Sequence, residues 1–264
     1  MKTGISTASL FTRYNTEDAL SFLSKNGVEV AEVFLESYCE YNKKFGKLLR
    51  KRRGNTEIHS IHTLTTQFEP QLYSVNERAK ADSFNLLKST AEAGEAMGAK
   101  YYTFHGTARL KKNSAPVDVE RVGKITQEII DVIKPHGITL AYENVHWCNY
   151  NYLGFFEEIR KRTTGLKATL DVKQARSSGL SPYDLIKEMK GDIVTVHLSD
   201  VLPNGKMCLP GKGITDFEEL FRHLHGVGFD GAMLIEAYTG DYGDESELFE
   251  SLDYIKNLSA KIFK

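Results

Sequence analysis

Several features that would indicate a particular class of protein are missing from this sequence of 264 residues. Its three cysteines, Cys39, Cys148 and Cys208, lie far apart without a C-x-x-C pair, which favours free thiols over a disulfide framework or a structural zinc site. Lys and Arg number 34 against 35 Asp and Glu, so the formal charge of -1 provides no broad positive field for nucleic acid. The composition therefore argues against a disulfide-rich secreted protein and against a nucleic-acid-binding protein.

Long hydrophobic runs are missing as well. No apolar stretch is long enough to cross a bilayer, so we expect no membrane partner. Met1 leads almost directly into the apolar-alternating segment Gly4 to Ala8, without a basic leader or an apolar export segment. The sequence therefore predicts a cytoplasmic protein.

The first β-rich run is not followed by the G-x-G-x-x-G loop that is typical of a doubly wound open sheet, which is the main alternative fold. The chain also has no linker, low-complexity stretch or shift in composition that would divide it. Residues 1–264 are therefore predicted to form a single domain.

Short β-rich runs alternate with helical segments, as expected when helices join parallel strands. Glycine follows several helical segments, for example at Asn26-Gly27 and Met97-Gly98, where it would end the helix. The predicted strands are Lys2 to Ser9, Val28 to Glu36, Glu57 to Leu64, Lys100 to Gly106, Thr139 to Val145, Leu166 to Asp171, Asp192 to Leu198 and Gly231 to Ala237. The predicted helices lie near residues 16 to 26, 42 to 53, 76 to 97, 117 to 135, 153 to 163, 181 to 190, 215 to 226 and 244 to 262. Eight strand–helix pairs in a chain of this length predict an α/β fold, a closed (β/α)8 TIM barrel.

The last four predicted strands each end in a side chain that suits metal coordination. These side chains are Glu143, Asp171, His197 and Glu236. In this fold the chemistry lies at the C-terminal ends of the strands, so the four side chains should meet. Burying three carboxylates together is very unfavourable without a cation, because each loses hydration and repels the others. We therefore predict that the four residues bind one divalent metal ion.

The expected donor set of three oxygens and one nitrogen suits a fairly hard ion. Mn²⁺ is the first choice, with Mg²⁺, Co²⁺ and Zn²⁺ as alternatives. The competing interpretation is that Glu143 and Asp171 pair with nearby Arg or Lys side chains, or cap the helices that follow them.

Five short motifs contain or flank these residues. They are Tyr142-Glu143-Asn144, Leu170-Asp171-Val172-Lys173-Gln174, His197-Leu198-Ser199-Asp200, Pro210-Gly211-Lys212-Gly213 and Ile235-Glu236. In order and approximate spacing they resemble the xylose isomerase-like TIM barrel superfamily of sugar phosphate isomerases and epimerases, which includes ketose 3-epimerases and inosose dehydratases. The resemblance covers almost the whole chain. It implies the same four metal ligands, with Glu143 and Glu236 also moving protons, and it implies a homo-oligomer, since such barrels are commonly homodimers.

The predicted function is a metal-dependent isomerase or epimerase of a small sugar, keto-sugar or polyol. A metal that chelates the carbonyl and the neighbouring hydroxyl of a ketose makes the carbon-bound proton acidic and stabilises the enediolate. With Glu143 and Glu236 as the acid–base pair, proton return at the opposite face gives epimerisation, and return at the adjacent carbon gives isomerisation. If the neighbouring hydroxyl leaves, the same centre gives a dehydratase of an inosose or a dehydroshikimate-like keto-polyol. A carbohydrate-binding relative without catalysis is a further alternative.

Endonuclease IV shares the superfamily and has ligands for two further zinc ions, but the sequence matches only some of them. His62 and His105 lie at the predicted ends of strands three and four, as its extra histidines do. However, Gln174 stands where a histidine is expected, and Gly205-Lys206-Met207 replaces an Asp-Arg-His stretch. A phosphodiesterase of this kind is therefore the less favoured alternative, and both histidines become candidates for hydrogen-bonding substrate hydroxyls.

Other candidates for substrate binding are placed near the same end of the barrel. Trp147, after strand five, offers an apolar wall for a sugar ring, and Lys212 lies where barrels often bind a phosphate. The sequence leaves open whether the substrate is phosphorylated. Glu32 and Asp200 are candidates to orient the metal ligands. The complete set of predicted substrate contacts is His62, His105, Gln174, Arg109, Lys212 and Trp147.

Overall fold

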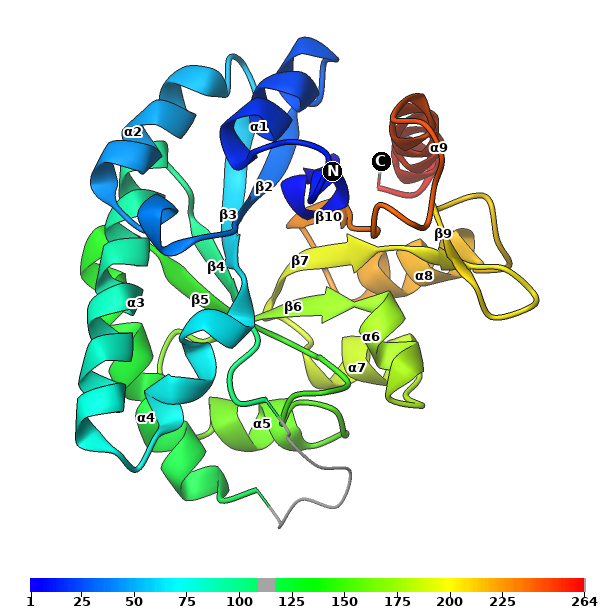
Figure 1. Ribbon diagram of the computed structural model, residues 1–264. Helices are drawn as coiled ribbons and strands as arrows, with labels where there is room; N and C mark the ends of the chain where they lie inside the picture. The colour runs from blue at the N-terminus through cyan, green and yellow to red at the C-terminus, as the bar shows by residue number, and fades with distance from the viewer. Residues whose placement is uncertain (109–116, 264) are drawn as a thin grey trace.

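Eight parallel strands close into the predicted barrel in the computed structural model, which describes residues 1–108 and 117–263 (Figure 1). Around the barrel the strands follow the order β1, β10, β7, β6, β5, β4, β3 and β2. Their bounds are β1 Lys2–Ser6, β2 Val30–Leu35, β3 Glu57–Thr63, β4 Tyr101–Phe104, β5 Thr139–Glu143, β6 Lys167–Asp171, β7 Ile193–Leu198 and β10 Ala232–Ile235. Each predicted strand is therefore present, with ends that shift by up to three residues. The (β/α)8 TIM barrel is confirmed.

Helices surround the strands, as Figure 1 shows. The α-helices are α1 Thr16–Lys25, α2 Lys43–Arg52, α3 Glu77–Met97, α4 Val119–Ile133, α5 Phe155–Arg160, α6 Val172–Ser177, α7 Pro182–Glu188, α8 Phe217–Gly226 and α9 Ser246–Ile262. Short 3₁₀ helices are η1 Thr7–Leu10, η2 Tyr38–Glu40, η3 Thr65–Gln67, η4 Glu69–Tyr73 and η5 Lys134–His136. Among the described residues, no helix is both long and apolar enough to cross a membrane.

Local side chains define where several helices begin and end. The Asn42 side chain accepts a hydrogen bond from the backbone N–H of Phe45 at 3.0 Å, and thereby caps α2. The Asp216 side chain caps α8 in the same way, with Glu219 N at 2.9 Å. Gly98, which follows α3, has φ +89°, a left-handed conformation that favours glycine. The predicted helix stop at Met97-Gly98 is confirmed.

Besides the short 3₁₀ helices, helix α6 and one small hairpin were not predicted from the sequence. Helix α6 begins directly after β6, because the Asp171 side chain that ends the strand also accepts a hydrogen bond from Gln174 N at 2.7 Å. Strands β8 (Asp200–Val201) and β9 (Met207–Cys208) form a small antiparallel hairpin beyond β7. Both elements are too short to show a hydrophobic period in the sequence.

Candidate metal centre and substrate cavity

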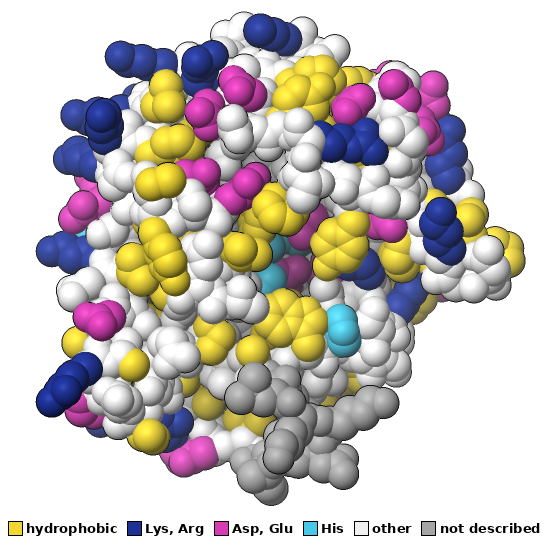
Figure 2. All heavy atoms as spheres, in the orientation of Figure 1, with side chains coloured by type: hydrophobic (Ala, Val, Ile, Leu, Met, Phe, Trp, Pro, Cys, Tyr) yellow, Lys and Arg dark blue, Asp and Glu magenta, His cyan; other side chains and the backbone are white. Residues whose placement is uncertain are grey.

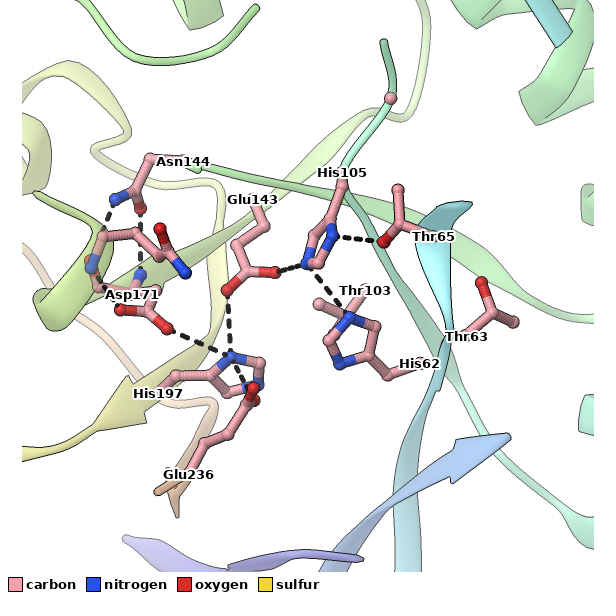
Figure 3. Close-up of polar contacts among 12 residues, drawn as sticks. His62, Thr63, Thr65, Thr103, His105, Glu143, Asn144, Asp171, His197 and Glu236 are labelled. Carbon is pink, nitrogen blue, oxygen red and sulfur yellow. Dashed lines mark hydrogen bonds and ion pairs between the residues drawn. The ribbon is translucent and has the colours of Figure 1, made fainter. Parts of the chain in front are cut away.

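The four predicted ligands meet at the C-terminal ends of four adjacent strands (Figure 3). The Nδ1 atom of His197 lies 3.1 Å from Glu143 Oε1 and 2.8 Å from Glu236 Oε2. It lies 3.9 Å from Asp171 Oδ2. Parallel pairing explains this convergence, since Asp171 and His197 are direct partners in the register of β6 and β7.

The four side chains are buried, with exposed fractions of 1% for Glu143, 2% for Asp171, 1% for His197 and 9% for Glu236. Glu143 Oε2 and Glu236 Oε2 make no well-aligned hydrogen bond to any described residue, although histidine nitrogens lie 2.6 and 2.8 Å away. Donor atoms of Glu143, Asp171 and His197 lie within 4.8 Å of one another. Short distances without hydrogen-bond alignment fit donor atoms that face a shared cation.

The buried charges of these side chains shift one another's pKa values. Burial raises the pKa of Asp171 to about 7, with Glu143 and Glu236 adding to the effect and Lys173 opposing it. For Glu236, burial acts in the same direction but the positive charge of His197 outweighs it and lowers the pKa. The Glu143 pKa is lowered as well, because His105 and His197 outweigh burial. Glu143 and Glu236 are therefore ionised at neutral pH and able to accept a proton.

Glu32, in the middle of β2, lies next to Nε2, the second ring nitrogen of His197. Its Oε1 atom lies 3.1 Å from His197 Nε2 and 3.5 Å from His62 Nδ1. Ser60 and Thr103 donate hydroxyl hydrogen bonds to Oε2 at 2.7 and 2.6 Å. Burial opposes the charge of Glu32, but His197 and His62 outweigh it and keep the pKa low. Glu32 therefore lies in contact with His197, one of the four predicted ligands.

His62 and His105 lie side by side at the ends of β3 and β4. Their Nε2 atoms are 3.0 Å apart, and His105 Nε2 is 2.6 Å from Glu143 Oε2. His105 Nδ1 also contacts the Thr65 hydroxyl. The structure thus brings both predicted histidines to the candidate metal centre, and donor atoms of His62, His105 and Glu143 lie within 4.8 Å of one another.

Glu69 on η4 supports the candidate site, and the sequence did not reveal it. It is fully buried and accepts hydrogen bonds from the backbone N–H groups of His105 and Gly106 at 3.0 and 3.2 Å. The Tyr102 and Thr63 hydroxyls donate to its other oxygen at 2.7 and 3.0 Å. Glu69 therefore fixes the loop that presents His105. The available signal was an acidic residue close to the apolar residues Phe68, Leu72 and Tyr73.

A cavity of about 190 Å³ opens beside the metal centre. Figure 2 shows this hollow, in which histidine and acidic side chains lie between hydrophobic ones. The ring of Trp147 packs edge-on against His105, with 5.4 Å between ring centroids. The lining residues are Ala8, Phe11, Phe34, His62, Thr63, Leu64, Thr65, Thr66, His105, Glu143, Trp147, Gln174, Glu236 and Tyr238. A more open hollow of about 510 Å³ lies over α2 and contains none of the predicted site residues.

Lys173 supplies a positive charge close to this cavity. It is 7% exposed, and its Nζ lies 3.8 Å from the centre of the Tyr238 ring. Burial opposes its charge, yet Asp171 and Glu236 outweigh burial and raise the Lys173 pKa. The sequence motif contained Lys173, but no pattern indicated that it would be buried.

Two other predicted residues lie elsewhere. The Lys212 side chain is 48% exposed, with Nζ 3.2 Å from Glu250 Oε2, and it is not among the residues that line the cavity. Asp200 accepts hydrogen bonds from the backbone N–H groups of Gly213 and Thr215 at 2.9 and 3.0 Å, so it organises the loop after β9. The prediction that Asp200 orients a metal ligand is wrong, because its oxygens face this loop. Arg109 lies outside the described residues.

Comparison with known proteins agrees with the fold. The family model for the xylose isomerase-like TIM barrel matches residues 20–258. The chain is 22% identical to the L-ribulose-5-phosphate 3-epimerase UlaE of Shigella flexneri, over 72% of this chain and 68% of that protein. Two solved structures of low identity share the fold. A D-tagatose 3-epimerase-like protein has TM-score 0.82 and 19% identity, and covers 99% of this chain and 98% of its own. The IolI protein with a bound zinc atom has TM-score 0.82 and 18% identity, with 100% of each chain covered. This chain belongs to the xylose isomerase-like TIM barrel family.

Proposed function

We propose that this protein is a divalent-metal-dependent isomerase or epimerase of a small sugar, keto-sugar or polyol. The observation that carries the proposal is the convergence of Glu143, Asp171 and Glu236 on Nδ1 of His197, beside a cavity of about 190 Å³. The names of the similar proteins, a pentulose-phosphate 3-epimerase and a D-tagatose 3-epimerase-like protein, support the same class of reaction.

The buried donor set supports a divalent ion, with Mn²⁺ as the first choice and Mg²⁺, Co²⁺ or Zn²⁺ as alternatives. The zinc atom of the similar IolI protein supports a divalent metal without identifying the ion in this chain. A bound ion would polarise the carbonyl of a ketose and make the neighbouring carbon-bound proton more acidic.

Glu143 and Glu236 are the proposed acid–base pair. Both line the cavity, and they approach His197 from different strands in Figure 3. Because their pKa values are lowered, both are ionised at neutral pH, and either one can take the carbon-bound proton. The product depends on which carbon then receives a proton, and on which face of that carbon receives it. Return to the opposite face of the same carbon gives the epimer.

The cavity favours a substrate without a phosphate group. Among its lining residues in the described chain, none is Lys or Arg, whereas phosphate binding normally uses such cations. The nearby charge of Lys173 is offset by Asp171 and Glu236. Lys212, the predicted phosphate-binding residue, pairs with Glu250 instead. Trp147 and Phe34 supply apolar surface of the kind that covers the face of a sugar.

The first test is the metal content of the purified protein by elemental mass spectrometry, together with turnover of a panel of ketoses. We expect about one Mn²⁺, Mg²⁺ or Co²⁺ per chain, by analogy with single-ion sites. Glu236→Gln should abolish turnover, since it removes a proton carrier and a ligand; full activity in this variant would exclude that role. Glu250→Gln, on the exposed partner of Lys212, is the matched control and should retain activity.

The same preparation separates the alternatives. Loss of water from a keto-polyol, detected as a mass decrease in the product, would favour the dehydratase. Two or three zinc ions per chain would favour the phosphodiesterase, because His62, His105 and Glu143 form a second group with metal-ligand spacing. Absence of metal under every loading condition would contradict the proposed function.

A further inference from the structure

We propose that His146 fixes Gln174 as a hydrogen-bond donor that selects substrates with an oxygen acceptor beside the metal centre. This inference rests on the proposed function, because it concerns how the same cavity recognises its substrate. It assigns a positioning role to His146, on the loop that follows β5.

Gln174 is held at both ends. Its backbone N–H donates to Asp171 Oδ1 at 2.7 Å, so the residue is anchored to a metal ligand. Its side-chain Oε1 lies 3.3 Å from the backbone N of His146 and 2.5 Å from the ring Nδ1 of His146. The Gln174 side chain therefore bridges the start of α6 and the loop after β5.

These contacts determine which way the amide faces. A backbone N–H can only donate, so the Gln174 atom that faces His146 N must be the carbonyl oxygen. With Oε1 in that position, the NH₂ group takes the opposite direction. The second contact then requires the hydrogen of neutral His146 to reside on Nδ1, because Gln174 Oε1 is an acceptor.

The NH₂ group has donor capacity left over. No described residue accepts a hydrogen bond from Gln174 Nε2, although the residue is only 7% exposed and lines the cavity. Leaving such a donor without a partner once a substrate has displaced solvent from the cavity is costly. A hydroxyl or carbonyl oxygen of the substrate supplies the missing acceptor, whereas a methyl or amine at that place leaves the donor unpaired.

The tautomer of His146 is measurable without any substrate. Nitrogen-15 NMR of the metal-loaded protein should show a protonated Nδ1 and an unprotonated Nε2 for His146, with His146→Phe identifying the signals. The opposite tautomer would mean that the ring cannot donate to Gln174, and it would overturn the proposal.

Binding of a ketohexose tests the consequence for recognition. D-Tagatose is titrated into Mn²⁺-loaded wild type, Gln174→Met and His146→Phe by calorimetry, and kcat and KM are measured wherever turnover is seen. Gln174→Met keeps the shape of the side chain without the amide. We expect a dissociation constant about tenfold higher in both variants, as for one lost hydrogen bond, with kcat within about twofold of wild type.

His146→Asn is the matched control, because its side-chain amide can donate from a position close to Nδ1 of the ring. It should recover most of the affinity that His146→Phe loses. Equal affinity in wild type and Gln174→Met would overturn the donor role. A loss of bound metal in His146→Phe, with unchanged sugar affinity at saturating Mn²⁺, would overturn it too, because the pair would then act only through Asp171.

Different results would contradict the proposed sugar activity and the His146–Gln174 donor. A wild-type protein that binds no ketohexose in any metal form contradicts the proposed sugar activity, and with it the substrate that the donor is meant to recognise. Wild-type binding that both variants retain in full contradicts only the His146–Gln174 donor.

Discussion

Carboxylates lie next to both ring nitrogens of His197. Nε2 lies 3.1 Å from Glu32, and Nδ1 faces Glu143, Asp171 and Glu236. A neutral imidazole that donates its hydrogen from Nε2 to a carboxylate keeps the lone pair of Nδ1 for a metal ion. Glu32 Oε1 lies 3.1 Å from Nε2 without hydrogen-bond alignment, but its negative charge there favours the tautomer that carries the hydrogen on Nε2. Its own buried charge is stabilised by hydroxyl donors such as Ser60 and Thr103.

Replacing Glu32 by Gln should therefore weaken metal binding. We expect the dissociation constant for Mn²⁺ to rise by about 10- to 100-fold, the range typical of lost partners of metal-bound histidines. Calorimetry measures the change. Glu29→Gln removes an exposed carboxylate directly before β2 and should leave the dissociation constant for Mn²⁺ unaltered. Unchanged affinity in Glu32→Gln would show that His197 keeps its orientation without this partner.

Metal affinity should also depend on pH. The Asp171 pKa is raised to about 7, chiefly by burial, so below pH 7 a proton occupies this ligand and must leave when the metal binds. The His197 pKa is raised as well, because Glu236, Glu32 and Glu143 outweigh burial. Acidification therefore favours the metal-free form. We expect Mn²⁺ binding to release about one proton more per ion at pH 6 than at pH 8, because Asp171 loses its proton over this interval.

Calorimetry in buffers of different ionisation enthalpy counts these protons. The dissociation constant should rise steeply as the pH falls from 7 to 6, and a constant value over this interval would contradict the coupling. Glu29→Gln, in which the four ligands are intact, is expected to follow the wild-type curve.

The end of β4 depends on one glycine. Gly106 has φ +74°, and a Cβ atom built there would lie 2.0 Å from the hydroxyl oxygen of Tyr142. Glu69 accepts the backbone N–H of the same residue at 3.2 Å. A side chain at Gly106 would therefore push against a buried aromatic ring and displace His105, its neighbour in the chain.

Gly106→Ala tests this packing, and Gly98→Ala is its matched control. Gly98 has φ +89°, but open space surrounds the added Cβ, so only the left-handed conformation costs free energy, about 1 kcal/mol. Gly106→Ala should lose about 1 to 3 kcal/mol more in the free energy of unfolding, because the clash adds overpacking. Denaturant titration measures both. Equal losses would mean that Tyr142 moves aside freely.

As a whole, the barrel concentrates negative charge at one end of its strands. Without a cation, Glu143, Asp171 and Glu236 share a buried region in which the positive groups are histidines and Lys173. A ligand that binds the folded state alone stabilises it by a free energy that rises with the logarithm of the ratio of its concentration to its dissociation constant. The proposed metal should therefore hold the four strand ends together.

Metal removal should accordingly lower the melting temperature. At a Mn²⁺ concentration about 100 times the dissociation constant, the expected stabilisation is about 2.7 kcal/mol. For a chain of this size that corresponds to about 5 to 10 °C. Thermal unfolding with EDTA and with Mn²⁺ measures the difference, and Glu236→Gln should show a smaller one. An identical melting temperature in both conditions would contradict a metal that stabilises the fold.

The barrel and its four proposed ligands were predictable from the chain alone, because both depend on short-range patterns. Alternating strand and helix segments imply parallel strands, and parallel strands of a barrel place Glu143, Asp171, His197 and Glu236 at the same end. The chemistry of three carboxylates and an imidazole then predicts a cation. Glu32 was identifiable as a charged residue inside an apolar strand.

Other parts of the centre depend on contacts between loops that are distant in the sequence. Glu69 reaches His105 across 36 positions, and His146 reaches Gln174 across 28. Asp200 had the expected spacing but faces the loop at Gly213, and Lys212 turns toward α9. Residue type and spacing indicate which strand end carries a polar group, whereas the partner of that group depends on how loops pack over the barrel, and packing is a property of the folded chain.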